Sequence, residues 1–222
     1  MTGAERTTIE TANDPLPAYL APADHGLERR PAVIVVQEYW GLVPHIEDVC
    51  RRLAAEGFTA VAPDLYRGRL AEEPDEARKL SMELDRDRAA EDLRAEVGWL
   101  LDRGASSVGA VGFCMGGGLV WTLAHTEDRL GAAVAFYGLS EVHGLRRRAP
   151  LLAHYGTADR FPPQQIEELR AQLASDGLPG EVITYEGAPH AFFNDTRDDA
   201  YRAGPARAAW ESTLTFLREH LG

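Results

Sequence analysis

The sequence VGAVGFCMGGG at residues 108–118 determines the architecture expected of this chain. A short apolar run ends at a cysteine, and small residues then open an apolar segment, Leu119–Ala124. This order predicts a buried strand, a tight turn and a helix. Gly112 and Gly116 flank Cys114 in the pattern G-x-C-x-G, which is the nucleophile elbow G-x-S-x-G with sulfur in place of the hydroxyl oxygen. We expect Cys114 at a helix N-terminus, where free N–H groups and the helix dipole favour a thiolate. The alternative is an inert, buried cysteine in a Gly-rich turn.

Apolar runs alternate with helical patterns along the rest of the chain. Ala32–Val36 is continuously apolar, as expected for a strand buried on both faces, and Pro44–Glu56 follows with helical spacing. The other expected strands are Thr7–Thr11, Leu16–Ala21, Phe58–Ala62, Ala132–Tyr137, Leu151–Tyr155 and Glu181–Tyr185. The other expected helices are two within Glu72–Arg103, one containing Ile166–Leu173, and Tyr201–Glu219. This alternation predicts one α/β domain over residues 1–222, with a mostly parallel sheet flanked by helices and no large cap domain.

Composition restricts the partners and the compartment. The net charge of −12 argues against nucleic acid and anionic membrane surfaces as partners. No run approaches transmembrane length, and Met1–Asp14 has no apolar core for a signal peptide. The two cysteines cannot form a disulfide framework, which favours a reducing cytoplasm, and Cys50 shares helical spacing with apolar residues and is expected in the core. Both a monomer and a homodimer are compatible with the sequence.

A carboxylate and a histidine follow the cysteine in the order that an α/β-hydrolase site requires. Asp159 lies in the loop just after the strand Leu151–Tyr155, and His190 lies in the loop after Glu181–Tyr185. Both positions are carboxyl ends of strands, on the edge of the sheet where Cys114 is expected. We therefore expect His190 to take the thiol proton and return it to the leaving group, and Asp159 to orient the imidazole ring. A turn aspartate and an ordinary loop histidine are the alternatives.

Glu38 is a further candidate, because it ends a buried strand where no solvated side chain is expected. A buried carboxylate without a partner is costly, so a polar neighbour is expected. Glu38 is either a structural residue or a proton acceptor for the thiol. An oxyanion hole at this elbow takes one backbone N–H from the loop Glu38–Gly41 and the other from Met115, the residue after the nucleophile.

The remaining histidines show no paired ligand spacing, so we expect neither a metal nor another cofactor. These residues are His25, His45, His125, His143, His154 and His220.

Several motifs together resemble the dienelactone hydrolase family of the α/β-hydrolase superfamily, from about Pro31 to the C-terminus. They are QE-x-x-G at 37–41, APDLY at 62–66, GFCMGG at 112–117, YG at 137–138, G-x-x-D at 156–159 and G-x-x-H-x-F at 187–192. The resemblance implies an α/β-hydrolase fold, a Cys114 nucleophile, a His190 base and an orienting Asp159. It also implies that Glu38 contacts the resting thiol and accepts its proton when substrate binds, and that the N–H of Tyr39 joins the oxyanion hole. The expected function is hydrolysis of a small ester or lactone through an acyl-enzyme.

The substrate-binding positions depart from the family pattern. Dienelactone enzymes hold a substrate carboxylate with two arginines and a tyrosine, and those positions correspond here to Pro74, Arg78 and Asn194. Dienelactone itself is therefore a doubtful substrate, whereas thiol-based cleavage is little affected. The candidate substrate-binding residues are Trp40, Arg78, Tyr137, Phe192 and Asn194.

Other functions remain open. The same triad is compatible with a thioesterase, an acyltransferase or a cysteine amidase. Amidotransferase-type sites expect a carboxylate two residues after the histidine, where this chain has Phe192. A non-catalytic ligand-binding protein or a redox sensor using Cys114 is the remaining alternative, although no nearby second cysteine supplies a resolving thiol.

Overall fold

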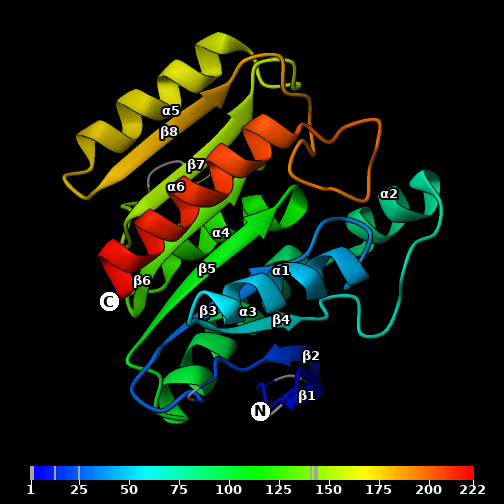
Figure 1. Cartoon of the computed structure of the whole chain (residues 1–222), viewed down its shortest axis with the longest axis vertical. Coiled ribbons are helices and arrows are strands. Elements are labelled where there is room, and N and C mark those ends of the chain that lie inside the picture. Colours follow the sequence, from blue (N-terminus) through cyan, green and yellow to red (C-terminus); the bar gives the residue numbers. More distant parts are fainter. Residues whose placement is uncertain (1–2, 13, 25, 141, 143–144) are drawn as a thin grey trace.

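The computed structural model describes residues 3–12, 14–24, 26–140, 142 and 145–222. Within them the strands are β1 (Glu5–Ile9), β2 (Leu16–Ala21), β3 (Pro31–Val36), β4 (Thr59–Pro63), β5 (Ser107–Phe113), β6 (Leu130–Phe136), β7 (Leu151–Gly156) and β8 (Gly180–Tyr185). The helices are α1 (Pro44–Ala55), α2 (Pro74–Glu83), α3 (Arg86–Asp102), α4 (Met115–Thr126), α5 (Pro163–Ser175) and α6 (Ala203–Leu221). Figure 1 shows how these elements are arranged.

The described strands form one sheet in the order β1-β2-β4-β3-β5-β6-β7-β8. The β1–β2 and β2–β4 pairs are antiparallel, and every pair from β4 to β8 is parallel. No large cap domain lies over the sheet in the described residues. The predicted α/β fold with a mostly parallel sheet is confirmed.

The predicted elements are all present, with shifted ends. The first strand was expected at Thr7–Thr11 but is Glu5–Ile9, because only those residues pair with β2. Thr11 instead donates its hydroxyl to the carbonyl oxygen of Asp14, in the turn between the two strands. The last helix begins at Ala203 rather than Tyr201.

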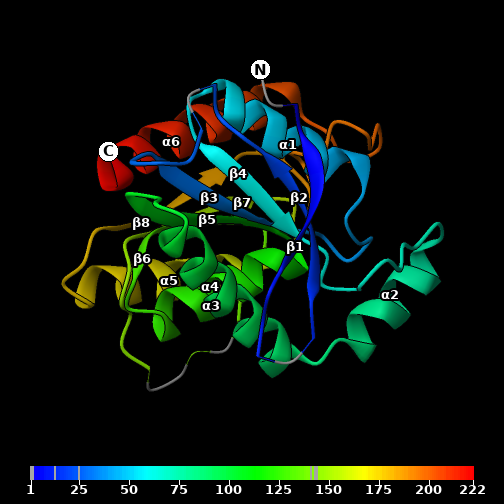
Figure 2. The ribbon, with the colours of Figure 1, turned by 90° about the horizontal axis from the view of Figure 1, so that it is seen from below.

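The sheet lies between two layers of helices, and side chains of β3 pack against both layers. Ile34 and Val36 pack into the apolar cluster that includes residues of α3, α4 and α5. Val33 and Val35 pack on the opposite face, in the cluster that includes residues of α1 and α6. Figure 2 shows the two helical layers edge-on. This alternation explains why the β3 sequence is apolar throughout.

Glycines allow α4 to pack directly against the strand ends. A Cβ atom on Gly112 would lie 2.2 Å from the carbonyl oxygen of Gly116. A Cβ atom on Gly116 would lie 2.4 Å from the carbonyl oxygen of Val36 at the end of β3. Larger residues at these two positions would push helix and sheet apart, and the turn between them would lose its shape.

Helix α2 stands apart from the two layers (Figures 1 and 2). Its buried residues, Ala77 and Leu80, pack in a small separate cluster with Tyr66 and Met115. Because Met115 is the residue after Cys114, this cluster brings α2 to the carboxyl edge of the sheet.

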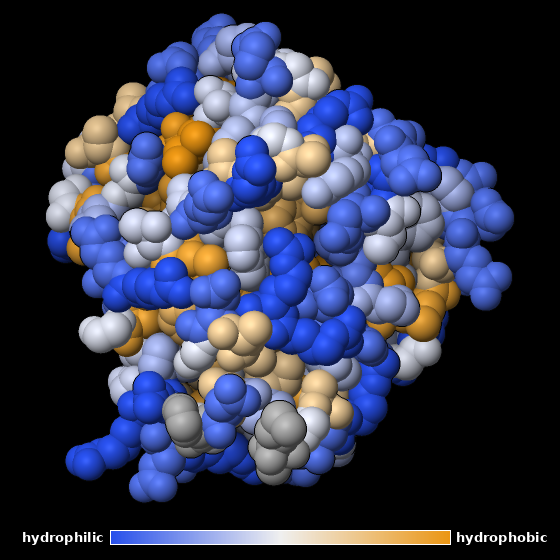
Figure 3. Space-filling model, viewed as in Figure 1, coloured by the Kyte–Doolittle hydropathy of each residue, from blue (hydrophilic) through white to orange (hydrophobic). Residues whose placement is uncertain are grey.

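The surface is mostly polar on the face that is drawn in space-filling form (Figure 3). On the face in Figure 3, hydrophilic residues cover most of the area and hydrophobic residues form small separate groups. Among the described residues, every helix is too short or too polar to cross a membrane.

Candidate active site

Cys114 occupies a strained turn between β5 and α4. Its backbone angles are φ 53° and ψ −114°, in a region that L-residues rarely adopt. Its N–H donates to the carbonyl oxygen of Phe136 at 3.0 Å, and its carbonyl oxygen accepts from Gly118 N–H at 3.2 Å. Such strain costs about 1–3 kcal/mol and persists only where the surroundings fix the backbone. The two bonds therefore fix Cys114 at the carboxyl edge of the sheet.

His190 lies between the sulfur and a carboxylate. Its Nε2 atom is 3.2 Å from Cys114 Sγ, and its Nδ1 atom is 3.0 and 2.9 Å from the two carboxylate oxygens of Asp159. The Asp159 side chain is buried, and its Oδ1 also accepts from the backbone N–H of Arg160 at 2.6 Å. The structure thus brings together the three residues that the sequence predicts as nucleophile, base and orienting acid.

The surroundings of His190 favour its protonated form. Burial disfavours the imidazolium, but hydrogen bonds to Asp159 and Cys114 outweigh it and raise the pKa of His190 from 6.5 to about 9. An imidazolium 3.2 Å from the sulfur would stabilise a thiolate at Cys114.

Strained backbone gathers around the three residues. The described non-glycine residues with positive φ are Arg29, Arg67, Cys114, Tyr137 and Ala191. Tyr137 directly follows β6, and its ring centroid is 5.1 Å from that of His190; Ala191 directly follows His190. Concentrated strain of this kind is typical of functional sites.

A cavity of about 710 Å³ opens above Cys114 and His190. Of the other predicted site residues, Glu38, Tyr39, Trp40, Arg78 and Met115 also line it. Tyr137, Phe192 and Asn194 do not line it, because they are buried behind its wall. Tyr137 and Phe192 were candidates because they belong to motifs that resemble the family, and Asn194 because it stands at the position of a substrate-binding arginine; a sequence motif does not reveal whether a side chain faces the cavity.

Tyr39 and Met115 lie on the two segments expected to supply the oxyanion hole. Met115 is the first residue of α4, so its N–H has no acceptor within the helix. Tyr39 lies in the turn after β3. The hydroxyl of Tyr66 is 3.3 Å from the Tyr39 carbonyl oxygen and 3.3 Å from Met115 Sδ, so Tyr66 contacts both segments.

Arginines line the cavity in a protein that is acidic as a whole. Besides Arg78, they are Arg86, Arg160 and Arg197. Arg78 pairs with Asp75 and Arg197 pairs with Asp199, whereas no ion pair to a carboxylate forms at Arg86 or Arg160 within the described residues. The carboxylates in the lining are Glu38 and Asp87, so the arginines outnumber them.

Sequence reasoning missed three of these arginines. Arg160 directly follows Asp159, and Arg197 lies in the same loop after β8 as His190; both positions are signals that could have been used. Arg86 begins α3, and nothing in its local sequence connects it with a site.

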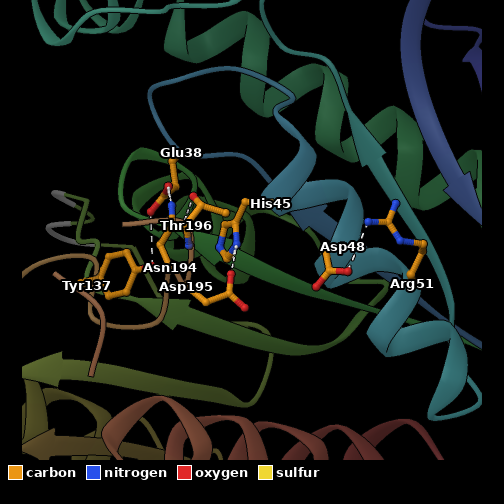
Figure 4. A network of polar contacts seen from close by, with 8 residues as sticks. All are labelled: Glu38, His45, Asp48, Arg51, Tyr137, Asn194, Asp195 and Thr196. Atoms are coloured by element: carbon orange, nitrogen blue, oxygen red, sulfur yellow. Dashed lines mark hydrogen bonds and ion pairs between the residues drawn. The ribbon is translucent and has the colours of Figure 1, made fainter. Parts of the chain in front are cut away.

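Glu38 forms two hydrogen bonds to residues that do not line the cavity (Figure 4). Its Oε1 accepts from the Tyr137 hydroxyl at 3.3 Å, and its Oε2 accepts from Asn194 Nδ2 at 2.7 Å. The resemblance implies a contact between Glu38 and the resting thiol. In this structure the thiol is hydrogen-bonded to His190, and Glu38 is bound to Tyr137 and Asn194.

Comparisons with known proteins show which family this chain is similar to. The family model described as "Dienelactone hydrolase family" matches residues 16–221. "Putative carboxymethylenebutenolidase" from Yersinia pestis is 35% identical, and the alignment covers 96% of this chain and 87% of that protein. "Protein usf" from Aquifex pyrophilus is 33% identical over 86% of this chain and 89% of that protein.

A solved structure agrees with these similarities. The crystal structure titled as a "Putative Dienelactone Hydrolase" from Klebsiella pneumoniae subsp. pneumoniae superposes with a TM-score of 0.87 at 31% sequence identity. The match covers 97% of this chain and 98% of the other. The similarity therefore extends over the whole fold and includes every element that carries the site.

Proposed function

The chain belongs to the dienelactone hydrolase family, a family of ester and lactone hydrolases, and we propose that it cleaves a small ester or lactone through Cys114, His190 and Asp159. One observation carries this proposal: His190 Nε2 is 3.2 Å from Cys114 Sγ while its Nδ1 is held by the Asp159 carboxylate. This is the arrangement of a nucleophile, its base and the group that orients the base.

The reaction proceeds in two halves. The Cys114 sulfur attacks the carbonyl carbon, and the backbone N–H groups of Tyr39 and Met115 donate to the developing oxyanion. The C–O bond to the leaving group breaks as the His190 imidazolium donates its Nε2 proton to the departing oxygen, which leaves a thioester on Cys114. Neutral His190 then takes a proton from a water molecule as that water attacks the thioester, and the carboxylic acid is released with the thiol restored.

Glu38 is the second acid–base group of this proposal. Glu38 lines the same cavity as Cys114. Its carboxylate accepts hydrogen bonds from Tyr137 and Asn194, which do not line that cavity. We assign to it the acceptance of the Cys114 thiol proton as the sulfur attacks, while the His190 imidazolium donates its own proton to the leaving group; Glu38 returns its proton to the sulfur when the thioester is hydrolysed.

The cations of the cavity favour a substrate with an anionic group. Arg86 and Arg160 line the cavity without an ion-paired carboxylate among the described residues, whereas the whole protein carries a net charge of −12. A positive cavity in a negative protein focuses the field and concentrates anions at the site. A carboxylate or phosphate on the substrate would contact these guanidinium groups, away from the scissile bond.

The test is turnover of a panel of small esters, lactones, thioesters and amides by the wild type and by Cys114→Ala. The proposal expects ester or lactone turnover by the wild type and its loss in Cys114→Ala, with the fold preserved. Turnover retained by Cys114→Ala would exclude Cys114 as nucleophile. Turnover of thioesters or amides alone would favour the thioesterase or amidase alternative, and no turnover with any substrate would favour a binding or redox role.

A further inference from the structure

A second cavity, of about 240 Å³, lies on the face of the sheet that α1 and α6 cover (Figures 1 and 2). Its walls come from α1, α6 and the loop that joins β8 to α6. Within the described residues, it shares none of its lining with the cavity above Cys114 and His190. The lining residues that bear on its chemistry are Arg52, Phe193, Asp195, Tyr201, Arg207 and Trp210. The mechanism proposed above uses none of them.

The guanidinium group of Arg52 lies against two aromatic rings of this lining. Its Cζ atom is 4.4 Å from the ring centroid of Trp210 and 5.0 Å from that of Phe193. Among the described residues, no carboxylate pairs with Arg52, and its side chain makes no hydrogen bond. Cation–π contacts of this kind hold a long side chain in place without occupying its N–H donors. Arg52 is therefore a positioned cation whose donors are free to bind an anion.

Arg207 supplies a second cation to the same cavity. It lies three residues before Trp210 on α6, so the two side chains share one face of the helix. In the described part of the chain, Arg207 has no ion-paired carboxylate either. The cavity is thus lined by a guanidinium group from each of the two helices that border it.

Asp195 is the single carboxylate among the described lining residues. Its Oδ1 atom is 3.2 Å from Nδ1 of His45, which is buried outside the cavity (Figure 4). The lining therefore carries two positive side chains and one negative, whereas the whole protein has a net charge of −12. A ligand with a single negative charge balances this local excess.

The size and the aromatic walls of the cavity restrict the rest of the ligand. A protein cavity of about 150 Å³ is large enough to hold benzene, so about 240 Å³ has room for one ring and a small polar group. Phe193, Tyr201 and Trp210 supply flat apolar contacts for such a ring. The planar guanidinium fork matches the two oxygens of a carboxylate.

We propose that this cavity is a binding site for a small aromatic carboxylate. The carboxylate binds Arg52 and Arg207, and the ring packs against Tyr201 and Trp210. This site lies outside the catalytic cavity, so the proposal does not depend on the ester chemistry of Cys114.

The test is a ¹H–¹⁵N NMR titration of the tryptophan indole groups with sodium benzoate. Trp210 lines this cavity and Trp40 lines the catalytic one, so their two signals report on the two cavities separately. Trp40→Phe and Trp210→Phe assign the signals. The Trp210 signal should shift saturably with a Kd of about 1 mM or below, as a ligand of this size allows. No saturable shift of that signal up to about 20 mM benzoate would overturn the proposal.

Arg207→Gln removes an exposed cation and should raise the benzoate Kd read at Trp210 by about three- to tenfold. Arg218→Gln is the matched control on the same helix, because Arg218 pairs with Glu56 and does not line the cavity. Arg86→Gln is the control for the catalytic cavity. Both controls should leave the Kd at Trp210 unchanged. A Kd that Arg207→Gln does not alter, or that Arg86→Gln alone alters, would overturn the proposed site.

Two further probes separate the charge of the ligand from its ring. Benzamide keeps the ring without the charge, and acetate keeps the charge without the ring. Each should bind at the Trp210 site at least about tenfold more weakly than benzoate. Equal affinity for benzamide would contradict recognition of a carboxylate, and equal affinity for acetate would contradict recognition of a ring. If the wild type turns over no ester, the proposed function fails, whereas this titration still decides whether the second site exists.

Discussion

The Nε2 atom of His190 lies 3.2 Å from the Sγ atom of Cys114, although 76 residues separate the two in the chain. Strands β6 and β7 lie between β5, which ends beside Cys114, and β8, which precedes His190. The loop after β8 therefore reaches back across two strand ends, and Asp159 after β7 holds the imidazole from the side. The position of His190 depends on that carboxylate.

Asp159→Asn should lower kcat by about 10²–10⁴-fold, the usual range for a lost general acid–base function. The amide leaves the fold intact but no longer stabilises the imidazolium or fixes the ring. Steady-state kinetics with any substrate that the wild type turns over provides the measurement. Asp128→Asn, which alters an exposed ion pair with Arg148, is the control and should keep wild-type kinetics. A kcat within about threefold of wild type would remove Asp159 from the mechanism.

His190 should make stability depend on pH between about 6.5 and 9. Its pKa is raised in the folded protein, so the native state binds more protons than the unfolded state in this range, and stability falls as pH rises. The contribution of up to about 3 kcal/mol is fully present below pH 6.5 and is lost as pH rises through about 9. Urea unfolding of the wild type and of His190→Gln measures it, because groups common to both cancel. A difference in unfolding free energy between the wild type and His190→Gln that stays constant from pH 6 to 10 would contradict this prediction.

Gly116→Ala should destabilise the protein by at least about 3 kcal/mol, beyond the usual cost of overpacking a core. Its Cβ would lie 2.4 Å from Val36 O and 2.5 Å from Gln37 O, and backbone atoms cannot move aside cheaply. Gly204→Ala is the matched control, since no atom lies within 4 Å of its Cβ position. Chemical denaturation of both variants gives the comparison. Equal stabilities would mean that α4 does not need this close approach.

Arg86→Gln should raise KM for an anionic ester by about 3- to 10-fold and leave KM for its neutral analogue unchanged. Added salt should raise the wild-type KM for the anionic ester, because it screens the exposed guanidinium groups. Arg88→Gln is the control: Arg88 pairs with Asp14 and does not line the cavity. Equal effects on both esters would argue against an anion site.

Strong local patterns made much of the fold predictable. The apolar run at Ala32–Val36 predicts a strand buried on both faces, and β3 is one. The glycines around Cys114 predict a strand–turn–helix, and the structure has Cys114 at φ 53° in that turn. The order of Cys114, Asp159 and His190 at strand ends predicts their proximity, because parallel strands share a carboxyl edge.

The hydrogen-bond partners of Asn194 and the position of Arg86 at the cavity were not predictable in the same way. Asn194 was expected among the substrate-binding residues, yet its amide is buried and bonded to Glu38. A sequence does not show which of two polar residues 156 positions apart will meet. Arg86 reaches the cavity from the start of α3, and only the way α2 and α3 pack places it there.

The most direct measurement is intact-protein mass spectrometry during turnover of an activated ester, followed by peptide mapping. We expect an acyl adduct on the peptide containing Cys114 in the wild type, its disappearance as product is released, and no adduct on Cys114→Ala. Cys50 is fully buried, so it should stay unmodified and serves as an internal control. Turnover with no adduct, or an adduct that persists in Cys114→Ala, would contradict Cys114 as the nucleophile.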